Sequence, residues 1–176
     1  MTMAEAPPSD GAILERAFSL ANEAMFTVAL QRRRVTSTEP EDDTFVFRWW
    51  ADLQFLVVAL RRLRRAAELG RRVPAGAKDL SAALKAFDVA LPMLPLMRNV
   101  GEHIDDYALD NGRHKDISRR SLQVGAWDGA TYTWLGASLN VENARAAAET
   151  LHAAVRAALT TARTSGGPTV PKESER

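Results

Sequence analysis

Apolar residues recur every three or four positions along most of the chain, which is the pattern of helices that bury one face. The first such stretch opens at Asp10, a residue that can cap a helix, and is expected to end near Val35. The second opens at residues 38–41, which combine a capping-box spacing with an early proline, and is expected to last until Gly70 provides a left-handed stop.

The second stretch carries apolar residues on two sides of the helix that it predicts. We therefore expect this helix to lie at the centre of a bundle or at a dimer interface, with its tryptophans in the core. The two stripes contain Phe45, Trp49, Leu53, Leu56, Leu60 and Leu63, and Val46, Trp50 and Val57.

Two further helices are expected after a loop over residues 70–78. Asp79 can cap a third helix with an apolar stripe of its own. Pro92 and Pro95 then interrupt the pattern, and because proline fits best in a first helical turn, a fourth helix is expected to start at or near one of them. It is predicted to run to Leu109 and to end at Asn111-Gly112.

Residues 121–136 change from helical to strand-like periodicity. Asp128-Gly129 is a two-residue hairpin signal, and the segments before and after it alternate or are rich in Thr and aromatic residues. Asn140 can then cap a fifth helix through about Arg163. The chain is therefore predicted to be all-α, an antiparallel bundle of about five helices with a small β-hairpin before the last helix.

Length and composition fit one domain over residues 10–163, with tails at 1–9 and 164–176 that contain proline and polar residues. The 23 Lys and Arg nearly balance the 22 Asp and Glu, which excludes a histone-like cation or an acidic disordered chain. The absence of cysteine excludes disulfides and cysteine-ligated zinc. With no signal peptide and no long apolar run, we expect a soluble cytoplasmic protein without a membrane partner.

The fourth predicted helix carries the candidate chemistry. On a straight helix with 100° per residue, five polar side chains fall within an arc of about 140°. They are Arg98, Asn99, Glu102, His103 and Asp106. The opposite arc would hold Leu94, Met97, Gly101, Ile104 and Ala108, so the helix can bury one half and present the polar five together. Gly101 within this helix suggests close packing against a neighbouring backbone.

The segment Arg98-Asn99-x-x-x-His103 resembles the motif of the HEPN superfamily, helical bundles in which an Arg, a polar residue that is often Asn, three further residues and a His lie on a late helix. The order of helices over roughly residues 10–163 is also similar. One subgroup of the family places a Tyr two residues after the His. This chain has Asp105 there and Tyr107 two positions later, so a regulatory role of the tyrosine does not carry over.

The resemblance implies either of two functions. Many HEPN members are metal-independent ribonucleases of toxin–antitoxin or phage-defence systems, whereas others are non-catalytic modules that bind a nucleotide or a protein. The ribonucleases combine two Arg-His pairs across a homodimer interface, which implies a homodimer here, with RNA and an antitoxin or another protein as partners. The residues alone leave open whether this chain is an enzyme.

The residue types suit RNA cleavage by attack of the 2′-hydroxyl on the adjacent phosphate, a reaction that needs no cofactor and no metal. His103 can move the proton, Arg98 can clamp the phosphate, and Asn99 can orient the substrate or the histidine. Further substrate contacts are expected from the arc and from the basic residues that follow it. These are Glu102, Asp106, Arg113, Lys115, Arg119 and Arg120.

Other interpretations of the same residues remain open. Arg98 and Glu102 also have the i, i+4 spacing of a helix ion pair, and clusters of arginine occur at many helix ends, where they offset the helix dipole. A metal site among Glu102, His103, Asp105 and Asp106 is disfavoured because these residues lack the Glu-x-x-His spacing of helical metal ligands, and His114 and His152 lie far away in the sequence. A non-catalytic helical module that binds a protein partner or a nucleotide is therefore the second hypothesis.

Overall fold

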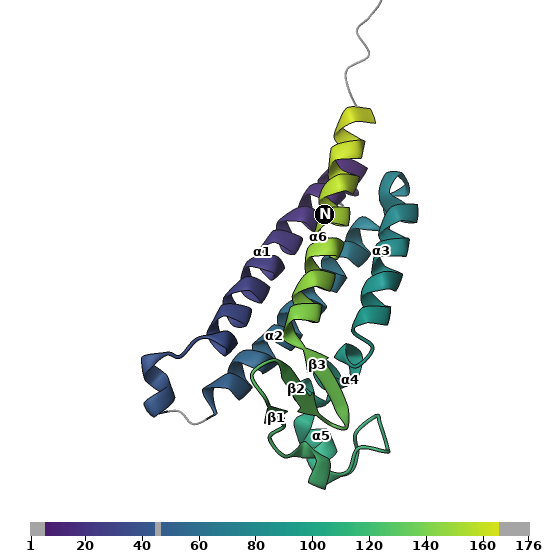
Figure 1. Ribbon diagram of the computed structural model, residues 1–176. Helices are drawn as coiled ribbons and strands as arrows, with labels where there is room; N and C mark the ends of the chain where they lie inside the picture. Colours follow the sequence, from purple (N-terminus) through teal and green to yellow (C-terminus); the bar gives the residue numbers. More distant parts are fainter. Residues whose placement is uncertain (1–5, 45–46, 166–176) are drawn as a thin grey trace, which may run out of the picture.

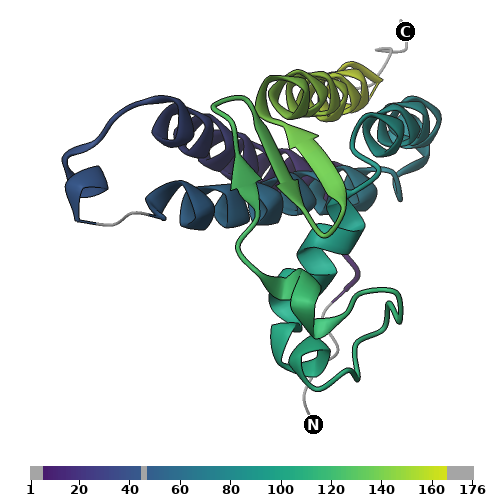
Figure 2. The same cartoon turned by 60° about the horizontal axis from the view of Figure 1, so that its bottom comes forward.

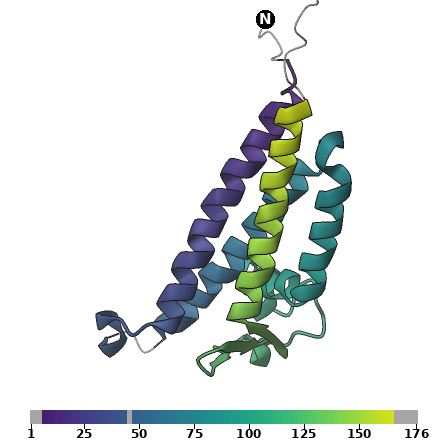
Figure 3. The ribbon, with the colours of Figure 1, turned by 45° about the horizontal axis from the view of Figure 1, so that its top comes forward.

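The computed structural model describes residues 6–44 and 47–165, which form an antiparallel helical bundle with a small sheet at one end (Figure 1). The long helices are α1 (Asp10–Thr36), α2 (Arg48–Gly70), α3 (Ala77–Ala90) and α6 (Val141–Ser165). Helix α2 contacts α1, α3 and α6 and runs behind α6 between α1 and α3 (Figure 3). The predicted all-α bundle is confirmed.

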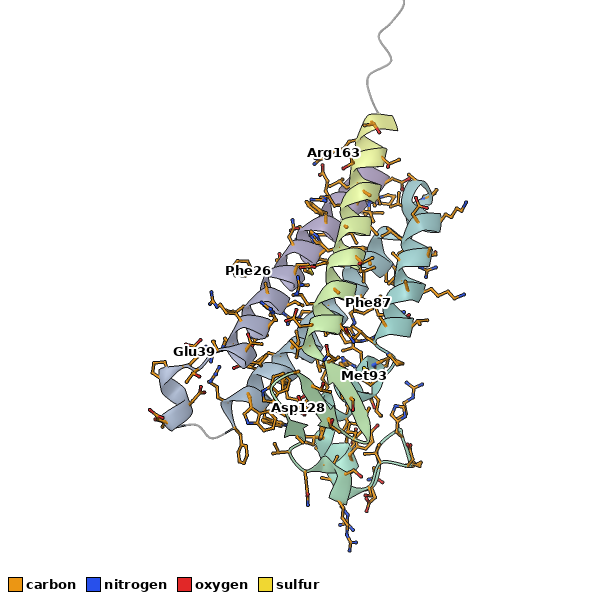
Figure 4. All side chains as sticks on the ribbon, viewed as in Figure 1. Phe26, Glu39, Phe87, Met93, Asp128 and Arg163 are labelled. Atoms are coloured by element: carbon orange, nitrogen blue, oxygen red, sulfur yellow. The ribbon has the colours of Figure 1, made fainter. Side chains whose placement is uncertain are left out.

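Burial follows the apolar stripes that the sequence displays. Both stripes of α2 are buried from Leu53 to Leu63 on one side and at Val57 on the other. Trp49 and Trp50, expected in the core, are only partly buried and pack against it, and Phe45 and Val46 lie outside the described residues. Phe87 on α3 faces α6 and is buried, whereas Phe26 projects outward from α1 (Figure 4).

The first helix starts as predicted, with a different cap. Ser9 is the N-cap residue, and its Oγ accepts a hydrogen bond from the Ala12 amide at 3.3 Å. Asp10, the expected cap, is instead the first helical residue, where its charge favours the positive end of the helix dipole. The helix ends at Thr36, one residue beyond the expected Val35.

The second helix does not begin at residues 38–41. Those residues lead into a short 3₁₀ turn, η1 (Pro40–Asp43), and α2 starts at Arg48. Arg48 is nearly buried and ties the connection together, because its guanidinium donates to Asp42, to Asp52 and to the Ser37 carbonyl. The hydrogen bonds from Arg48 and from the Glu39 amide hold the pKa of Asp42 below its ordinary value. This network favours a turn where the capping-box pattern predicts helix.

The third and fourth helices also begin or end at other residues than the sequence predicts. Helix α3 begins at Ala77, directly after a 3₁₀ turn, η2 (Pro74–Gly76), so Asp79 lies in its first turn and is not the cap. Helix α4 (Leu94–Glu102) has Pro95 in its first turn, as expected. It stops at Glu102 and does not continue to Leu109, because His103 leaves helical geometry with φ −122° and ψ 36°. A separate short helix, α5 (Ile104–Ala108), follows.

The break at His103 changes which side chains are buried. Leu94 and Met97 are buried as expected, but Gly101, Ile104 and Ala108 of the expected apolar arc are exposed. The expected packing of Gly101 against a neighbouring backbone is wrong, because its near neighbours are the side chains of Gln54 and Trp134. Tyr107 is buried instead, and its hydroxyl reaches back to Asn99. On a straight helix these two residues would be about 12 Å apart along the axis, and the bend shortens that separation.

The sheet contains one strand more than predicted. Strands β1 (Ala126–Trp127), β2 (Thr131–Trp134) and β3 (Ala137–Asn140) are antiparallel in the order β1-β2-β3. The expected hairpin is present, and Asp128 Oδ1 accepts from the amides of Ala130 and Thr131 in its turn. The unexpected second turn, Leu135-Gly136, has φ of 57° and 73°. Residues 121 and 122, the start of the segment with strand-like alternation, lie instead in a 3₁₀ turn, η3 (Arg119–Leu122).

The sheet closes one end of the bundle (Figure 2). Tyr132, Trp134 and Leu139 on its inner face are buried and belong to the core. The Asn140 side chain accepts from the Asn143 amide at 3.0 Å, so the predicted cap of the last helix is confirmed. At the other end, an Arg163–Glu15 ion pair at 3.1 Å joins the end of α6 to the start of α1.

A histidine on α6 links the last helix to the first. His152 Nε2 lies 2.7 Å from Asn22 Oδ1, and its ring stacks near Phe18 at 5.7 Å. Burial lowers the pKa of His152, and the charge of Arg156 lowers it further. The unfolded chain therefore takes up a proton at His152, near its ordinary pKa of about 6.5, before the folded chain does.

This difference predicts that the free energy of unfolding falls as the pH drops below about 6.5. The glutamine of His152→Gln can still form a hydrogen bond but cannot titrate. We therefore expect this variant to lose less stability than the wild type between about pH 7 and pH 5. Denaturant unfolding at several pH values measures both slopes. Identical slopes in the two proteins would contradict a lowered pKa at His152.

Within residues 6–44 and 47–165, no single helix is long and apolar enough to cross a membrane. The helical stretches 74–90 and 94–102 reach that length and apolarity only when taken together, and they are bent by 76°.

Candidate functional site

Helix α4 presents the motif because its apolar residues are fixed in the core. Leu94, Met97 and Val100 are fully buried, and the helix packs against α2. This packing turns the side containing Arg98 and Asn99 toward the edge of the bundle, where both are partly buried. The local sequence therefore determines the orientation of the first two motif residues.

Arg98 lies in an electropositive environment and has one carboxylate partner. It forms an i, i+4 ion pair with Glu102, and its side chain is 22% exposed. Burial lowers the pKa of the neighbouring Arg61, and the charges of Arg64, Arg65 and Arg98 lower it further. The Nε atom of Arg61 is buried and makes no hydrogen bond within the described chain. The two arginines thus add positive charge near one surface, with Arg98 paired to Glu102 and the Nε atom of Arg61 buried.

Asn99 is held in place by a tyrosine that sequence reasoning did not assign to the site. The Tyr107 hydroxyl donates to Asn99 Oδ1 at 2.6 Å and accepts from the His114 amide at 3.2 Å. Because Tyr107 is buried, these bonds fix the Asn99 side chain relative to α5 and to the loop that follows. The Asn99 amide nitrogen remains as the donor group of this side chain.

The loop after α5 packs directly on the same tyrosine. Gly112 is buried against the Tyr107 ring, and a Cβ atom at this position would lie 2.2 Å from Tyr107 Cδ1. Only glycine allows this approach. An aromatic residue followed five positions later by a glycine was the one sequence signal for this contact, and it is too common to identify it.

His103 stands at the break between α4 and α5. Its side chain is half-exposed, and its Nδ1 lies 3.8 Å from Asp106 Oδ2 on α5. This distance is within the range of an ion pair, so the Asp106 carboxylate is the acidic group beside the His103 ring. Nε2 has no hydrogen-bond partner among residues 6–44 and 47–165, which leaves it free to exchange a proton with a ligand.

The expected basic contacts lie in the segment after α5, and all four are exposed. They are Arg113, Lys115, Arg119 and Arg120. Turn η3, which contains Arg119 and Arg120, packs against α5, so these two side chains lie on the same end of the bundle as His103. Arg119 pairs with Asp110 at 3.0 Å, and both groups are well exposed, which leaves the arginine able to exchange partners.

The structure thus groups the nine expected site residues into neighbouring units and not into one helical arc. Arg98 with Glu102, Asn99 with Tyr107, and His103 with Asp106 are separate pairs along α4 and α5. Across the described ranges 6–44 and 47–165, no group of three or more His, Asp or Glu side chains is placed to hold a metal ion. The structure therefore shows three separate pairs, and the break at His103 places the imidazole on a different helix axis from Arg98 and Asn99.

Comparison with known proteins adds no assignment, because no family model, curated protein or solved structure matches the chain.

Proposed function

We propose that this protein is a HEPN-like, metal-independent endoribonuclease of the cytoplasm, acting in toxin–antitoxin or phage-defence systems, with Arg98, Asn99 and His103 as its catalytic residues. The observation that carries this proposal is the chemistry left available along α4 and α5. A half-exposed imidazole has a free Nε2 and a carboxylate 3.8 Å from its Nδ1, while an arginine and a tyrosine-anchored amide precede it on the adjoining helix α4.

The proposed reaction uses the RNA's own 2′-hydroxyl. Its oxygen bonds to the adjacent phosphorus while the bond from phosphorus to the 5′-oxygen breaks, which yields a 2′,3′-cyclic phosphate and a 5′-hydroxyl. His103 Nε2 exchanges the proton that leaves the nucleophile or joins the leaving group. Arg98 binds the non-bridging phosphate oxygens, where negative charge grows. The Arg98 guanidinium exchanges its ion pair with Glu102 for one with the phosphate, and Asp106 stabilises the imidazolium of His103.

One Arg-His pair can serve either the nucleophile or the leaving group, whereas the reaction needs a proton acceptor and a proton donor on opposite sides of the phosphate. The proposal therefore includes a two-fold dimer, in which the Arg-His pairs of the two copies face each other across one cleft. An exposed apolar side chain directly after α5 supports such an interface, since Leu109 is 71% exposed.

We expect the protein to be a dimer of about twice 19.3 kDa at tens of micromolar. Size-exclusion chromatography with light scattering measures the mass directly. Leu109→Glu is expected to shift the protein to the monomer, because a charge in an apolar interface is left without a partner. The surface variant Phe26→Glu, on the outer side of α1, serves as the control. A monomer at all concentrations would contradict the two-pair site.

The purified protein is expected to cleave single-stranded RNA in buffer that contains a strong chelator, at a rate equal to that without the chelator. The physical reason is that arginine and histidine supply the positive charge and the proton transfer. Gel analysis of a labelled RNA gives both rates. Loss of cleavage with chelator and its recovery with added magnesium would contradict this mechanism.

The second hypothesis, a non-catalytic helical module that binds a protein partner or a nucleotide, is favoured by one observation. Arg98 is already paired with Glu102, so its charge is partly satisfied within the chain. Binding of a partner without any RNA cleavage in the chelator experiment would support this alternative.

A further inference from the structure

A small apolar pocket lies between α2 and α4, beside Arg98. It has a volume of about 330 Å³, at the lower end of the range of small-molecule sites. Its lining includes Trp50, Gln54, Phe55, Gly101, Ile104 and Trp134. Arg98 and Glu102 also line it, so the pocket and the expected phosphate-binding group share one surface.

Gln54 places a hydrogen-bond acceptor in this otherwise apolar pocket. Its Nε2 donates to the Tyr132 hydroxyl at 3.0 Å, which fixes the amide. Tyr132 is buried, and burial raises its pKa to about 12, so this anchor stays neutral. With Nε2 engaged, Gln54 Oε1 faces Gly101 and has no partner among the residues that the structure describes. An acceptor held in this way can accept a hydrogen bond from a donor on a ligand.

Gly101 keeps that acceptor accessible. A Cβ atom at position 101 would lie 3.1 Å from Gln54 Oε1 and 3.9 Å from the Trp134 ring. Any side chain at this position would therefore cover the acceptor and narrow the pocket. Glycine has a lower helical propensity than most other residues, but its missing side chain leaves space in the pocket that Arg98 also lines.

We infer that this pocket is a base-binding subsite, in which one RNA base packs on the aromatic lining while Gln54 Oε1 accepts from its exocyclic amino group and Arg98 binds the adjoining phosphate. The inference rests on the proposed RNA function and adds base specificity to it. Aromatic side chains offer stacking surface to any base, so the discrimination comes from Gln54. Adenine, cytosine and guanine carry an exocyclic amino group, whereas uracil does not.

The test is calorimetric binding of the four nucleoside 3′-monophosphates to the full chain. We expect the uridine nucleotide to bind about tenfold more weakly than the best of the other three, because the only donor of its base, N3–H, lies between two carbonyl oxygens that Gln54 Oε1 repels. Gly101→Ala is expected to weaken binding of the preferred nucleotide by about tenfold while the thermal midpoint stays equal or rises, since alanine favours the helix. Gly11→Ala, where a Cβ meets only Ser9 Oγ at 4.0 Å, is the matched control.

A second pair of variants separates recognition from folding. Gln54→Glu keeps an acceptor oxygen and is expected to retain the preference for amino-bearing bases, whereas Gln54→Leu is expected to lose it. Equal binding of all four nucleotides by the wild type, or unchanged binding in Gly101→Ala, would overturn the subsite. A shift of the Gly101→Ala variant from dimer to monomer without a change in nucleotide binding would overturn the subsite as well, because the pocket would then hold the second copy.

Failure of the subsite and failure of the proposed function give different results. RNA cleavage at all four bases without nucleotide binding would overturn the subsite and leave the ribonuclease. Nucleotide binding with the expected base preference but without RNA cleavage would support the subsite and overturn the ribonuclease.

Discussion

Replacing His103 or Arg98 with alanine is expected to reduce RNA cleavage by about 10²- to 10⁴-fold each, because each removes either the proton-transfer group or the phosphate clamp. The fold is expected to tolerate both changes. His103 is half-exposed, and Arg98 has only its i, i+4 partner Glu102, so each variant should lose less than about 1 kcal/mol of stability. Single-turnover cleavage and denaturant unfolding measure the two effects.

The chain offers matched controls for both substitutions. Arg145 pairs with Glu149 at the same i, i+4 spacing on α6, and His152 is the partly buried histidine that contacts α1. Arg145→Ala and His152→Ala are expected to retain cleavage. If the variants at 98 and 103 instead lose about 1–3 kcal/mol of stability and wild-type protein cuts no RNA, the pair is structural.

Truncation of Tyr107 to alanine is expected to have the largest effect on stability, about 3–5 kcal/mol, which is the range for large buried aromatic side chains. The ring fills the space between α5 and the loop at Gly112, and the hydroxyl holds both Asn99 and the His114 amide. Chemical denaturation gives the change in the free energy of unfolding. The variant is also expected to lose cleavage, since Asn99 is released.

Tyr107→Phe separates the hydroxyl from the ring. It keeps the packing and removes two hydrogen bonds, so we expect a loss of about 1–3 kcal/mol and a reduced cleavage rate with the fold intact. Tyr132→Phe removes a hydroxyl that contacts Gln54 instead, and provides the comparison at a second buried tyrosine. A Tyr107→Phe protein with unchanged stability and unchanged cleavage would contradict the anchoring of Asn99.

Sequence periodicity was sufficient to predict the long helices, because burial of one face determines both the repeat and the packing. The ends were less predictable. Arg48 binds Asp42 and holds a turn where residues 38–41 suggest a helix start. The second turn of the sheet uses Leu135 at positive φ, a conformation that leucine rarely adopts and that no local pattern indicates.

The site was predictable in its residue types and not in its shape. Spacing alone predicts the Arg98–Glu102 ion pair. A helical wheel assumes a straight helix, and the break at His103 places that side chain and Asp106 on a different axis from Arg98. The hydrogen bond from Tyr107 to Asn99 depends on this bend and on the packing of a distant glycine, and neither leaves a periodic signal in the sequence.

The most direct test of the central claim is a single 2′-deoxy substitution at the cut site of an RNA that the protein cleaves. The proposed chemistry predicts that wild-type protein stops cutting at that linkage while it still cuts the unmodified RNA, and that mass spectrometry finds a 2′,3′-cyclic phosphate and a 5′-hydroxyl on the unmodified products. Continued cleavage at the 2′-deoxy linkage, or products that carry a 5′-phosphate, would contradict attack by the RNA's own hydroxyl and the role assigned to Arg98 and His103.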